Sequence, residues 1–150
     1  MIVSGKKELD ASREIVWGVI NDPAQMASLM PGVESFEIHD DRHWQAKVKV
    51  PLGLGGLKMS IAFTKLEERP LEFASLNAKG TGVGALMNMT TSFTLTGEGE
   101  KTSMAWEADV KIAGPVGSMG QRVLQPIINQ QVGNVLSALE AEVQAVKAGG

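Results

Sequence analysis

The sequence predicts an α+β fold, in which a curved antiparallel sheet of about seven strands wraps around a long C-terminal helix. Two observations carry this prediction. Up to Ile112, apolar residues occur at every second position, which is the side-chain period of a β-strand. After Pro115 they occur at every third or fourth position for about thirty residues, which is the period of a helix. A sheet that is followed by a helix across its face leaves a space between the two layers, and we expect the function to lie there.

Length and composition exclude several classes of protein. A chain of 150 residues suits one domain over residues 1–150 and buries roughly 70% of its unfolded surface. The net charge of −3 lacks the Lys and Arg excess that nucleic acids require, so no nucleic-acid partner is expected. Cys is absent, which excludes disulfides and thiolate sites. Because neither a signal peptide nor a span of about 20 apolar residues is recognisable, we expect a cytoplasmic protein.

The N-terminal part predicts one strand followed by two short helices. Residues 2–9 are expected to form the strand. Asp10 or Ser12 can cap a helix over residues 13–20. Pro23 begins the second helix, because proline suits the first turn of a helix. The large apolar residues of this second helix are Met26, Leu29 and Met30.

Six further strands are predicted from period-two alternation between turn signals. They cover residues 33–39, 43–50, a run that begins at 57 and ends before the turn at 68–70, 71–79, 85–96 and 104–112. A glycine-rich connection is expected over residues 51–56, and a hairpin turn over 97–100. Gly80, Gly82 and Gly84 are expected to loosen the connection after residue 79 as a bulge or sharp bend.

The last helix carries an apolar stripe that is too wide to face solvent, so it is expected to lie on the sheet. The stripe consists of Val116, Met119, Val123, Leu124, Ile127, Ile128, Gln131, Val132, Val135, Leu136, Leu139, Val143 and Val146. Pro126 is expected to kink this helix or to open it locally.

No constellation of residues predicts catalysis or metal binding. His39 and His43 flank Asp40 and Asp41, but adjacent side chains of a hairpin point to opposite faces, and Asp-Asp is an ordinary turn pair. The segment Gly80–Gly84 is similar to a phosphate-binding loop, yet it lacks the following Lys-Ser/Thr and leads into a strand. We therefore expect no catalytic residue and no metal site.

The apolar faces predict a ligand site instead. Met is abundant, with eight residues, while Tyr is absent, and Met suits adaptable apolar pockets. The residues expected to bind a ligand come from the short second helix, from inward strand faces and from the last helix. They are Met26, Leu29, Met30, Met59, Phe63, Met87, Met89, Met104, Trp106, Met119, Val123, Ile127 and Gln131. Gln131 lies within the apolar stripe, where its amide either bonds to the sheet or faces a polar ligand group. The alternative for the whole set is a solid core without a cavity.

The order of the elements is similar to that of the START-like (SRPBCC) superfamily, whose fold is called helix-grip. Three segments resemble the CoxG family, named after the G subunit of carbon monoxide dehydrogenase. They are Leu29-Met-Pro-Gly-Val-Glu34, Trp106-Glu-Ala-Asp-Val110, and the stretch from Gly114-Pro-Val-Gly-Ser-Met-Gly120 to Ile128. The resemblance covers essentially the whole chain.

The resemblance implies a non-enzymatic protein that binds a lipophilic small molecule between sheet and helix. The implied ligand is an isoprenoid quinone such as menaquinone, held without a covalent cofactor. The implied partner is a molybdenum hydroxylase of the carbon monoxide dehydrogenase type, which passes electrons to the membrane. The expected location is the cytoplasm, with peripheral contact at the inner face of the membrane.

Two alternatives stay open. In the first, the chain is an assembly or membrane-recruitment factor for the dehydrogenase, and the cavity is incidental. In the second, it is an aromatase/cyclase-type enzyme, which needs polar or acid–base groups inside the cavity, where only Gln131 is expected.

Overall fold

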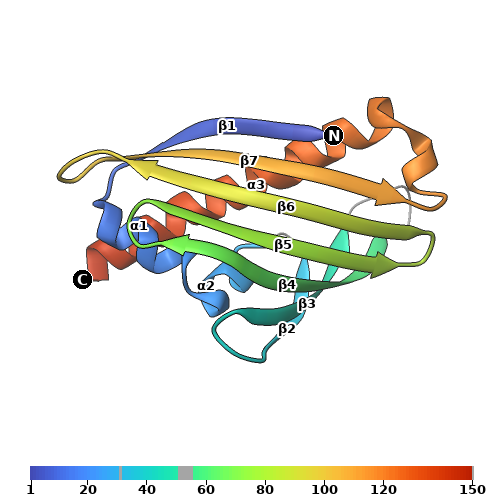
Figure 1. Ribbon diagram of the computed structural model, residues 1–150, viewed down its shortest axis with the longest axis horizontal. Coiled ribbons are helices and arrows are strands. Elements are labelled where there is room, and N and C mark those ends of the chain that lie inside the picture. The colour runs from blue at the N-terminus through green and yellow to red at the C-terminus, as the bar shows by residue number, and fades with distance from the viewer. Residues whose placement is uncertain (31, 51–55, 150) are drawn as a thin grey trace.

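A seven-stranded antiparallel sheet curves along one side of a 29-residue helix (Figure 1). The structure is a computed structural model that describes residues 1–30, 32–50 and 56–149. Its strands are β1 (Ile2–Leu9), β2 (Val33–Ile38), β3 (His43–Val50), β4 (Leu57–Arg69), β5 (Phe73–Gly82), β6 (Ala85–Thr96) and β7 (Thr102–Ala113). The helices are α1 (Arg13–Ile20), α2 (Pro23–Ser28), the 3₁₀ turn η1 (Gly117–Met119) and α3 (Gln121–Gly149). The predicted α+β architecture is therefore confirmed.

The sheet order is β1-β7-β6-β5-β4-β3-β2. The strands β1 and β2 follow each other in the sequence yet occupy opposite edges of the sheet. Helices α1 and α2 connect them across one end of the molecule (Figure 1). This connection closes that end of the space between the sheet and α3.

Local sequence signals explain where the short helices begin. Ser12 caps α1, and its side-chain oxygen accepts a hydrogen bond from the amide of Ile15 at 3.5 Å. Asp22 caps α2 by accepting from the amide of Ala24 at 3.0 Å, with Pro23 in the first turn. Of the two predicted caps for α1, Ser12 is the one that the structure uses.

Two predicted element boundaries need correction. Strand β5 continues through Gly80 to Gly82, so only Val83 and Gly84 form the turn to β6. An added Cβ at Gly80 would lie 2.9 Å from Met59 Cε, so a side chain at this position would displace the methyl end of Met59. The final helix begins at Gln121, so Val116 and Met119 precede it. The connection predicted over residues 51–56 lies outside the described residues, except for Gly56.

The most deeply buried part of the core lies between α1, the C-terminal half of α3 and the neighbouring ends of β1, β6 and β7. Leu9, Val16, Val19, Met104 and Val143 are each at most 2% exposed there. A second cluster packs α2 against β3, β4 and β5, and a third joins β1 and β7 to the middle of α3. The three clusters surround the space described below.

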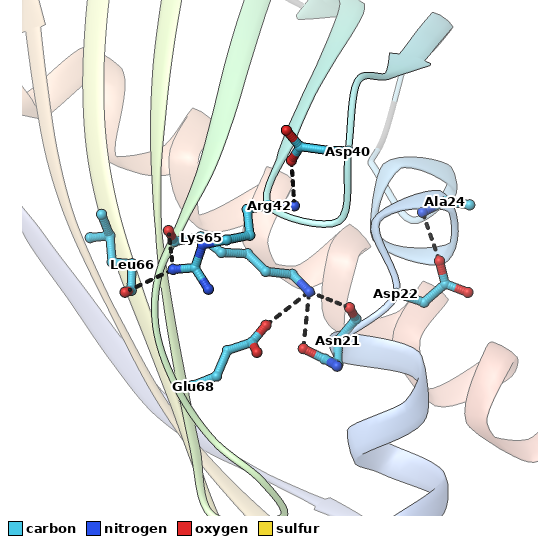
Figure 2. A network of polar contacts seen from close by, with 8 residues as sticks. All are labelled: Asn21, Asp22, Ala24, Asp40, Arg42, Lys65, Leu66 and Glu68. Carbon is cyan, nitrogen blue, oxygen red and sulfur yellow. Dashed lines mark hydrogen bonds and ion pairs between the residues drawn. The ribbon is translucent and has the colours of Figure 1, made fainter.

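A polar network fastens β4 to the end of α1 (Figure 2). The ammonium of Lys65, a residue that is only 9% exposed, donates to the backbone carbonyl of Asn21 at 2.6 Å and to its side-chain oxygen at 3.0 Å. It also pairs with Glu68 at 2.9 Å. Beside it, β4 carries a bulge between Lys65 and Glu67, and the guanidinium of Arg42 donates to the carbonyls of Lys65 and Leu66. Together these contacts satisfy the polar groups at this corner of the sheet.

None of the helices within the described residues is long and apolar enough to cross a membrane.

Candidate functional site: an apolar cavity between sheet and helix

A cavity of about 290 Å³ lies between the concave face of the sheet and α3. Its floor is built from alternate residues of strands β3 to β7, and its roof from the apolar stripe of α3. Two methionines, Met26 on α2 and Met30 just after it, form part of one wall. The lining residues are Met26, Met30, Trp44, Val48, Val50, Leu57, Met59, Ile61, Phe63, Leu76, Ala78, Ala85, Met87, Met89, Thr91, Phe93, Trp106, Ala108, Val110, Ile112, Val116, Leu124, Ile127, Ile128, Gln131, Val132, Val135 and Leu136.

Small residues in the floor give the cavity its depth. Ala78 pairs with Phe63 on β4 and with Met89 on β6, so larger neighbours flank it on both sides. Ala108 on β7 is a second small residue of the floor, and it pairs with Thr91 on β6. On the β3 and β4 side, the rings of Trp44 and Phe63 stack at 5.3 Å with an interplanar angle of 8°. The stack fixes one wall in place, while the methionines leave the centre adaptable.

The chemistry of the lining is almost entirely apolar. Among the described residues that line the cavity, none carries an ionisable side chain. The polar side chains are Thr91 on β6, Trp106 on β7 and Gln131 on α3. An apolar cavity with a few polar groups is typical of a site that binds a small molecule. The described part of the lining carries none of the acid and base side chains that proton-transfer catalysis uses.

The structure brings most of the predicted ligand-binding residues together. Those that line the cavity are Met26, Met30, Met59, Phe63, Met87, Met89, Trp106, Ile127 and Gln131. Their contact with a ligand stays a prediction, and their placement around one space favours a cavity over a solid core. Gln131 lines the cavity and is half-buried, and its contact with a polar ligand group stays a prediction.

The prediction is wrong for the placement of Leu29, Met104, Met119 and Val123, which do not line the cavity. Leu29 and Met104 are 6% and 0% exposed and belong to the packed cluster around α1. Met119 lies in η1, before the final helix, and is 44% exposed. Val123 is 42% exposed because Leu124, the next residue, takes the inward position on α3.

Sequence reasoning missed several lining residues that have a recognisable signal. Trp44 and Ile61 lie on the same strand faces as predicted neighbours, so their alternation alone could have identified them. Thr91 is a polar residue within the inward face of β6, between Met89 and Phe93. Ala78 and Ala108 carry no such signal, because a small residue marks open space only once its neighbours are known.

The hairpin with His39, Asp40, Asp41 and His43 is an exposed turn. Asp40 accepts from the amide of Arg42 at 2.8 Å and contacts His43 Nδ1 at 3.0 Å. The amide of Arg42, followed by the side chain of His43, lowers the pKa of the Asp40 carboxyl. Within the described residues, no group of three or more His, Cys, Asp or Glu side chains could hold a metal ion.

A larger hollow of about 580 Å³ lies on the surface between the β4–β5 and β6–β7 turns. Charged residues, among them Arg13, Arg69, Glu72 and Glu98, line it. Arg13 already donates to the carbonyl of Leu71, and Arg69 covers the ring of Phe73. Charged side chains line this hollow, and two of them already contact other residues. The smaller internal cavity is therefore the better candidate for a lipophilic ligand.

Comparison with known proteins agrees with this architecture. The family model described as the carbon monoxide dehydrogenase G subunit (CoxG) matches residues 5–144. No curated protein matches the sequence significantly.

Three solved structures have a similar fold. A conserved protein from Geobacillus kaustophilus has a TM-score of 0.89 and 20% identity, with 97% of this chain and 96% of that chain covered. A START superfamily protein from Mycobacterium smegmatis has a TM-score of 0.75 and 15% identity, with 97% and 98% covered. The Zhui aromatase/cyclase from Streptomyces sp. R1128 has a TM-score of 0.72 and 15% identity, with 96% and 93% covered. These likenesses confirm the START-like, helix-grip fold.

Proposed function

Because the chain belongs to the CoxG family, that of the carbon monoxide dehydrogenase G subunit, we propose that it is a non-catalytic binding protein for an isoprenoid quinone such as menaquinone. The observation that carries this proposal is the apolar cavity between the sheet and α3. A prenylated quinone gains about 0.8 kcal/mol for each CH₂ group that it buries, and it needs only one or two hydrogen bonds at its carbonyl oxygens. Both requirements agree with a lining of Met, aliphatic and aromatic side chains with three polar groups.

The size of the cavity supports a ligand that is only partly enclosed. Its volume of about 290 Å³ lies at the lower end of the range for small-molecule sites, roughly 300–1,000 Å³. A quinone ring with its first prenyl units suits such a space, and the rest of a long tail then extends beyond it. Adaptable side chains such as Met59 and Met87, which meet over Gly80, can widen the space as a ligand enters.

The proposal assigns the chain a carrier role beside a molybdenum hydroxylase of the carbon monoxide dehydrogenase type. In this role the bound quinone links the enzyme to the membrane pool of electron carriers, and the protein itself performs no chemistry. Support comes from the family and from the lack of ionisable groups among the described lining residues. An enzyme of the aromatase/cyclase kind shares the fold, but it needs acid–base groups in the cavity.

Contact with a membrane is the further part of the proposal, and one end of the molecule suits it. Val83 and Leu86 at the β5–β6 turn are 91% and 58% exposed, and Met119 and Val123 lie at the start of the helical segment. The amide of Val116 donates to the carbonyl of Gly84 at 2.9 Å, which holds the two segments together at one end (Figure 1). We call Val83, Leu86, Met119 and Val123 the apolar end. Exposed basic residues flank it: Lys58, Lys79, Lys111 and Arg122.

The first test is to purify the protein from a host that produces quinones, extract it with organic solvent and analyse the extract by mass spectrometry. We expect a prenylated quinone in near-stoichiometric amount. A protein that is empty, and that also fails to bind added quinone, would contradict the proposal and favour the assembly-factor alternative.

A substitution in the cavity floor provides a matched test. Ala78→Leu places a larger side chain between Phe63 and Met89, so we expect quinone retention to fall roughly tenfold, or about 1.4 kcal/mol. Ala62→Leu is the control, because Ala62 is exposed on the opposite face of the neighbouring strand β4. Equal retention by the two folded variants would show that the ligand does not occupy this cavity.

A further inference from the structure

The polar side chains of the cavity share a feature that the apolar lining does not explain. Thr91 Oγ1 and Trp106 Nε1 are buried, and neither has a hydrogen-bond partner among the described residues. Thr91 as a whole is only 9% exposed. A buried polar group without a partner is unfavourable, and most such groups in folded proteins are satisfied by protein, water or ligand. Water or a ligand therefore has to supply the partner of each group.

The two groups are neighbours on the floor of the cavity. Thr91 pairs with Ala108 and Trp106 pairs with Phe93 across β6 and β7, so Thr91 and Trp106 are diagonal neighbours on the inward face. Diagonal positions lie roughly 7–8 Å apart, and the sheet order β1-β7-β6 places the indole, which reaches toward β1, on the side of β7 away from Thr91. The indole of Trp106 rests against β1 at Gly5, where an added Cβ would lie 2.9 Å from the ring. Gly5 therefore leaves the space that the indole occupies.

The roof of the cavity contributes one further polar group. Ala108, the partner of Thr91, belongs to one cluster with Trp106, Ile128 and Val132. Gln131 precedes Val132 on α3 and lines the cavity. The Thr91 hydroxyl is buried in the ligand-free structure, so its contact with a ligand requires rotation about the Cα–Cβ bond.

The two ends of the cavity differ in their surroundings. On the side of α1, the packed cluster with Met104 and Leu139 closes the space, and both residues are at most 2% exposed. On the side of the apolar end, the lining is formed by Val50, Leu57, Ala85, Ile112 and Val116. Among the described lining residues, Thr91, Trp106 and Gln131 offer the polar partners for a ligand, while a hydrocarbon tail suits the section that leads to the apolar end.

We propose that Thr91, Trp106 and Gln131 are the groups that bind the polar head of the ligand through its acceptor oxygens. The inference rests on the proposed function and adds the ligand's orientation and the basis of its selection. The indole N–H can only donate, while the threonine hydroxyl can donate as well. A ligand head with acceptor oxygens can satisfy each of them, whereas a ligand head that only donates cannot satisfy Trp106.

The test compares two probes that differ only in their oxygens: a naphthoquinone that carries one prenyl group, and the naphthalene with the same substituents. Equilibrium dialysis measures their binding to the full chain. We expect the wild type to bind the quinone about tenfold more tightly than the hydrocarbon. Thr91→Val and Trp106→Phe should each weaken quinone binding about three- to tenfold and leave hydrocarbon binding within about twofold.

Two controls separate this role from a structural one. Thr90→Val removes a hydroxyl from the exposed face of the same strand and should change neither affinity. Thr102 is fully buried, and its hydroxyl donates to the carbonyl of Ala11 at 2.8 Å, so Thr102→Val should lower the melting temperature of the ligand-free protein. Thr91→Val should leave the melting temperature of the ligand-free protein unchanged or raise it, because the variant removes a hydroxyl without a partner.

The outcomes distinguish the subsite from the function on which it rests. Quinone binding that is unaffected by Thr91→Val and Trp106→Phe, or hydrocarbon binding that falls equally, would overturn the subsite and leave the binding function standing. A wild type that binds neither probe would overturn the proposed function, and the subsite with it.

Discussion

At the scale of single residues, the methionines of this chain have two different roles. Met104 is 0% exposed and packs with Leu95 and Leu139 in the cluster around α1. Met87 is half-buried and lines the cavity, close to Gly80. The same side chain is therefore a core residue at one position and a wall of the binding space at the other.

This difference predicts opposite effects of two alanine substitutions. Met104→Ala removes fully packed atoms, so it should lower the free energy of unfolding by about 2–5 kcal/mol. Met87→Ala borders existing space and should cost about 1 kcal/mol, but it should change quinone affinity. Urea denaturation of both variants, with quinone binding measured at a low urea concentration, checks the pair. A ligand-binding defect in folded Met104→Ala that exceeds the defect of Met87→Ala would contradict the assignment.

The alternation of apolar residues along a strand predicts the face of the sheet on which a residue lies, but not its position along the sheet. A period of two identifies the face of the sheet on which Met59, Met87 and Met104 lie, and the structure places all three on the inward face. It does not report the position along the sheet axis, which decides between the cavity and the packed core. Only the pairing register and the crossing point of α3 determine that position. For this reason the sequence pattern wrongly predicts Met104 in the site and does not predict Ala78.

At the scale of elements, the network around Lys65 determines how α1 sits on the sheet. The Lys65 ammonium donates to both oxygens of Asn21 at the end of α1, where a helix presents its partial negative charge (Figure 2). Glu68 on the same strand completes the set at 2.9 Å. One buried cation thus joins β4 to the segment that connects the two sheet edges.

Loss of this cation should loosen the α1 end of the molecule. Lys65→Ala leaves the Asn21 carbonyl and Glu68 without their partner, so we expect the free energy of unfolding to fall by about 1–3 kcal/mol. Lys79→Ala is the matched control, because Lys79 is exposed on the outer face of β5. Urea unfolding curves of the two variants provide the comparison. Equal midpoints would show that the network contributes no net stability.

The elements themselves are largely readable from the sequence. Ser12, Pro23 and the alternating runs locate the two short helices and the seven strands. The exceptions occur where tertiary contacts decide: β5 continues through Gly80 because its residues pair with β4 and β6 as far as Gly82. Helix α3 starts only at Gln121, since Gly120, at φ +84°, ends the preceding turn. A glycine in the sequence does not distinguish these two uses.

At the scale of the whole molecule, charge and apolar surface are unevenly distributed. The apolar end is flanked by Lys58, Lys79, Lys111 and Arg122. Acidic residues such as Glu98 and Glu100 lie at the β6–β7 turn, at the opposite end of these strands. A chain with a net charge of −3 therefore still presents one end that suits an anionic surface.

This distribution predicts selective binding to vesicles. We expect the protein to sediment with vesicles that contain anionic lipid more than with neutral ones, and less as salt is added. The double variant Val83→Asp, Leu86→Asp should reduce the bound fraction severalfold, because it places charge on the apolar end. Ile38→Asp is the control, since Ile38 is 41% exposed on the edge strand β2, away from that end. A similar loss in both variants would contradict a docking role for the apolar end.

The position of the aromatic residues has a practical consequence. The chain contains three tryptophans, and two of them, Trp44 on β3 and Trp106 on β7, line the cavity from opposite halves of the sheet, while Trp17 lies on α1. A bound chromophore would come into direct contact with the two cavity indoles and should quench their emission. In a Trp17→Phe background, the intrinsic fluorescence would come from the cavity alone. The protein thus carries its own optical reporter of occupancy, which follows loading and release in real time without an attached dye.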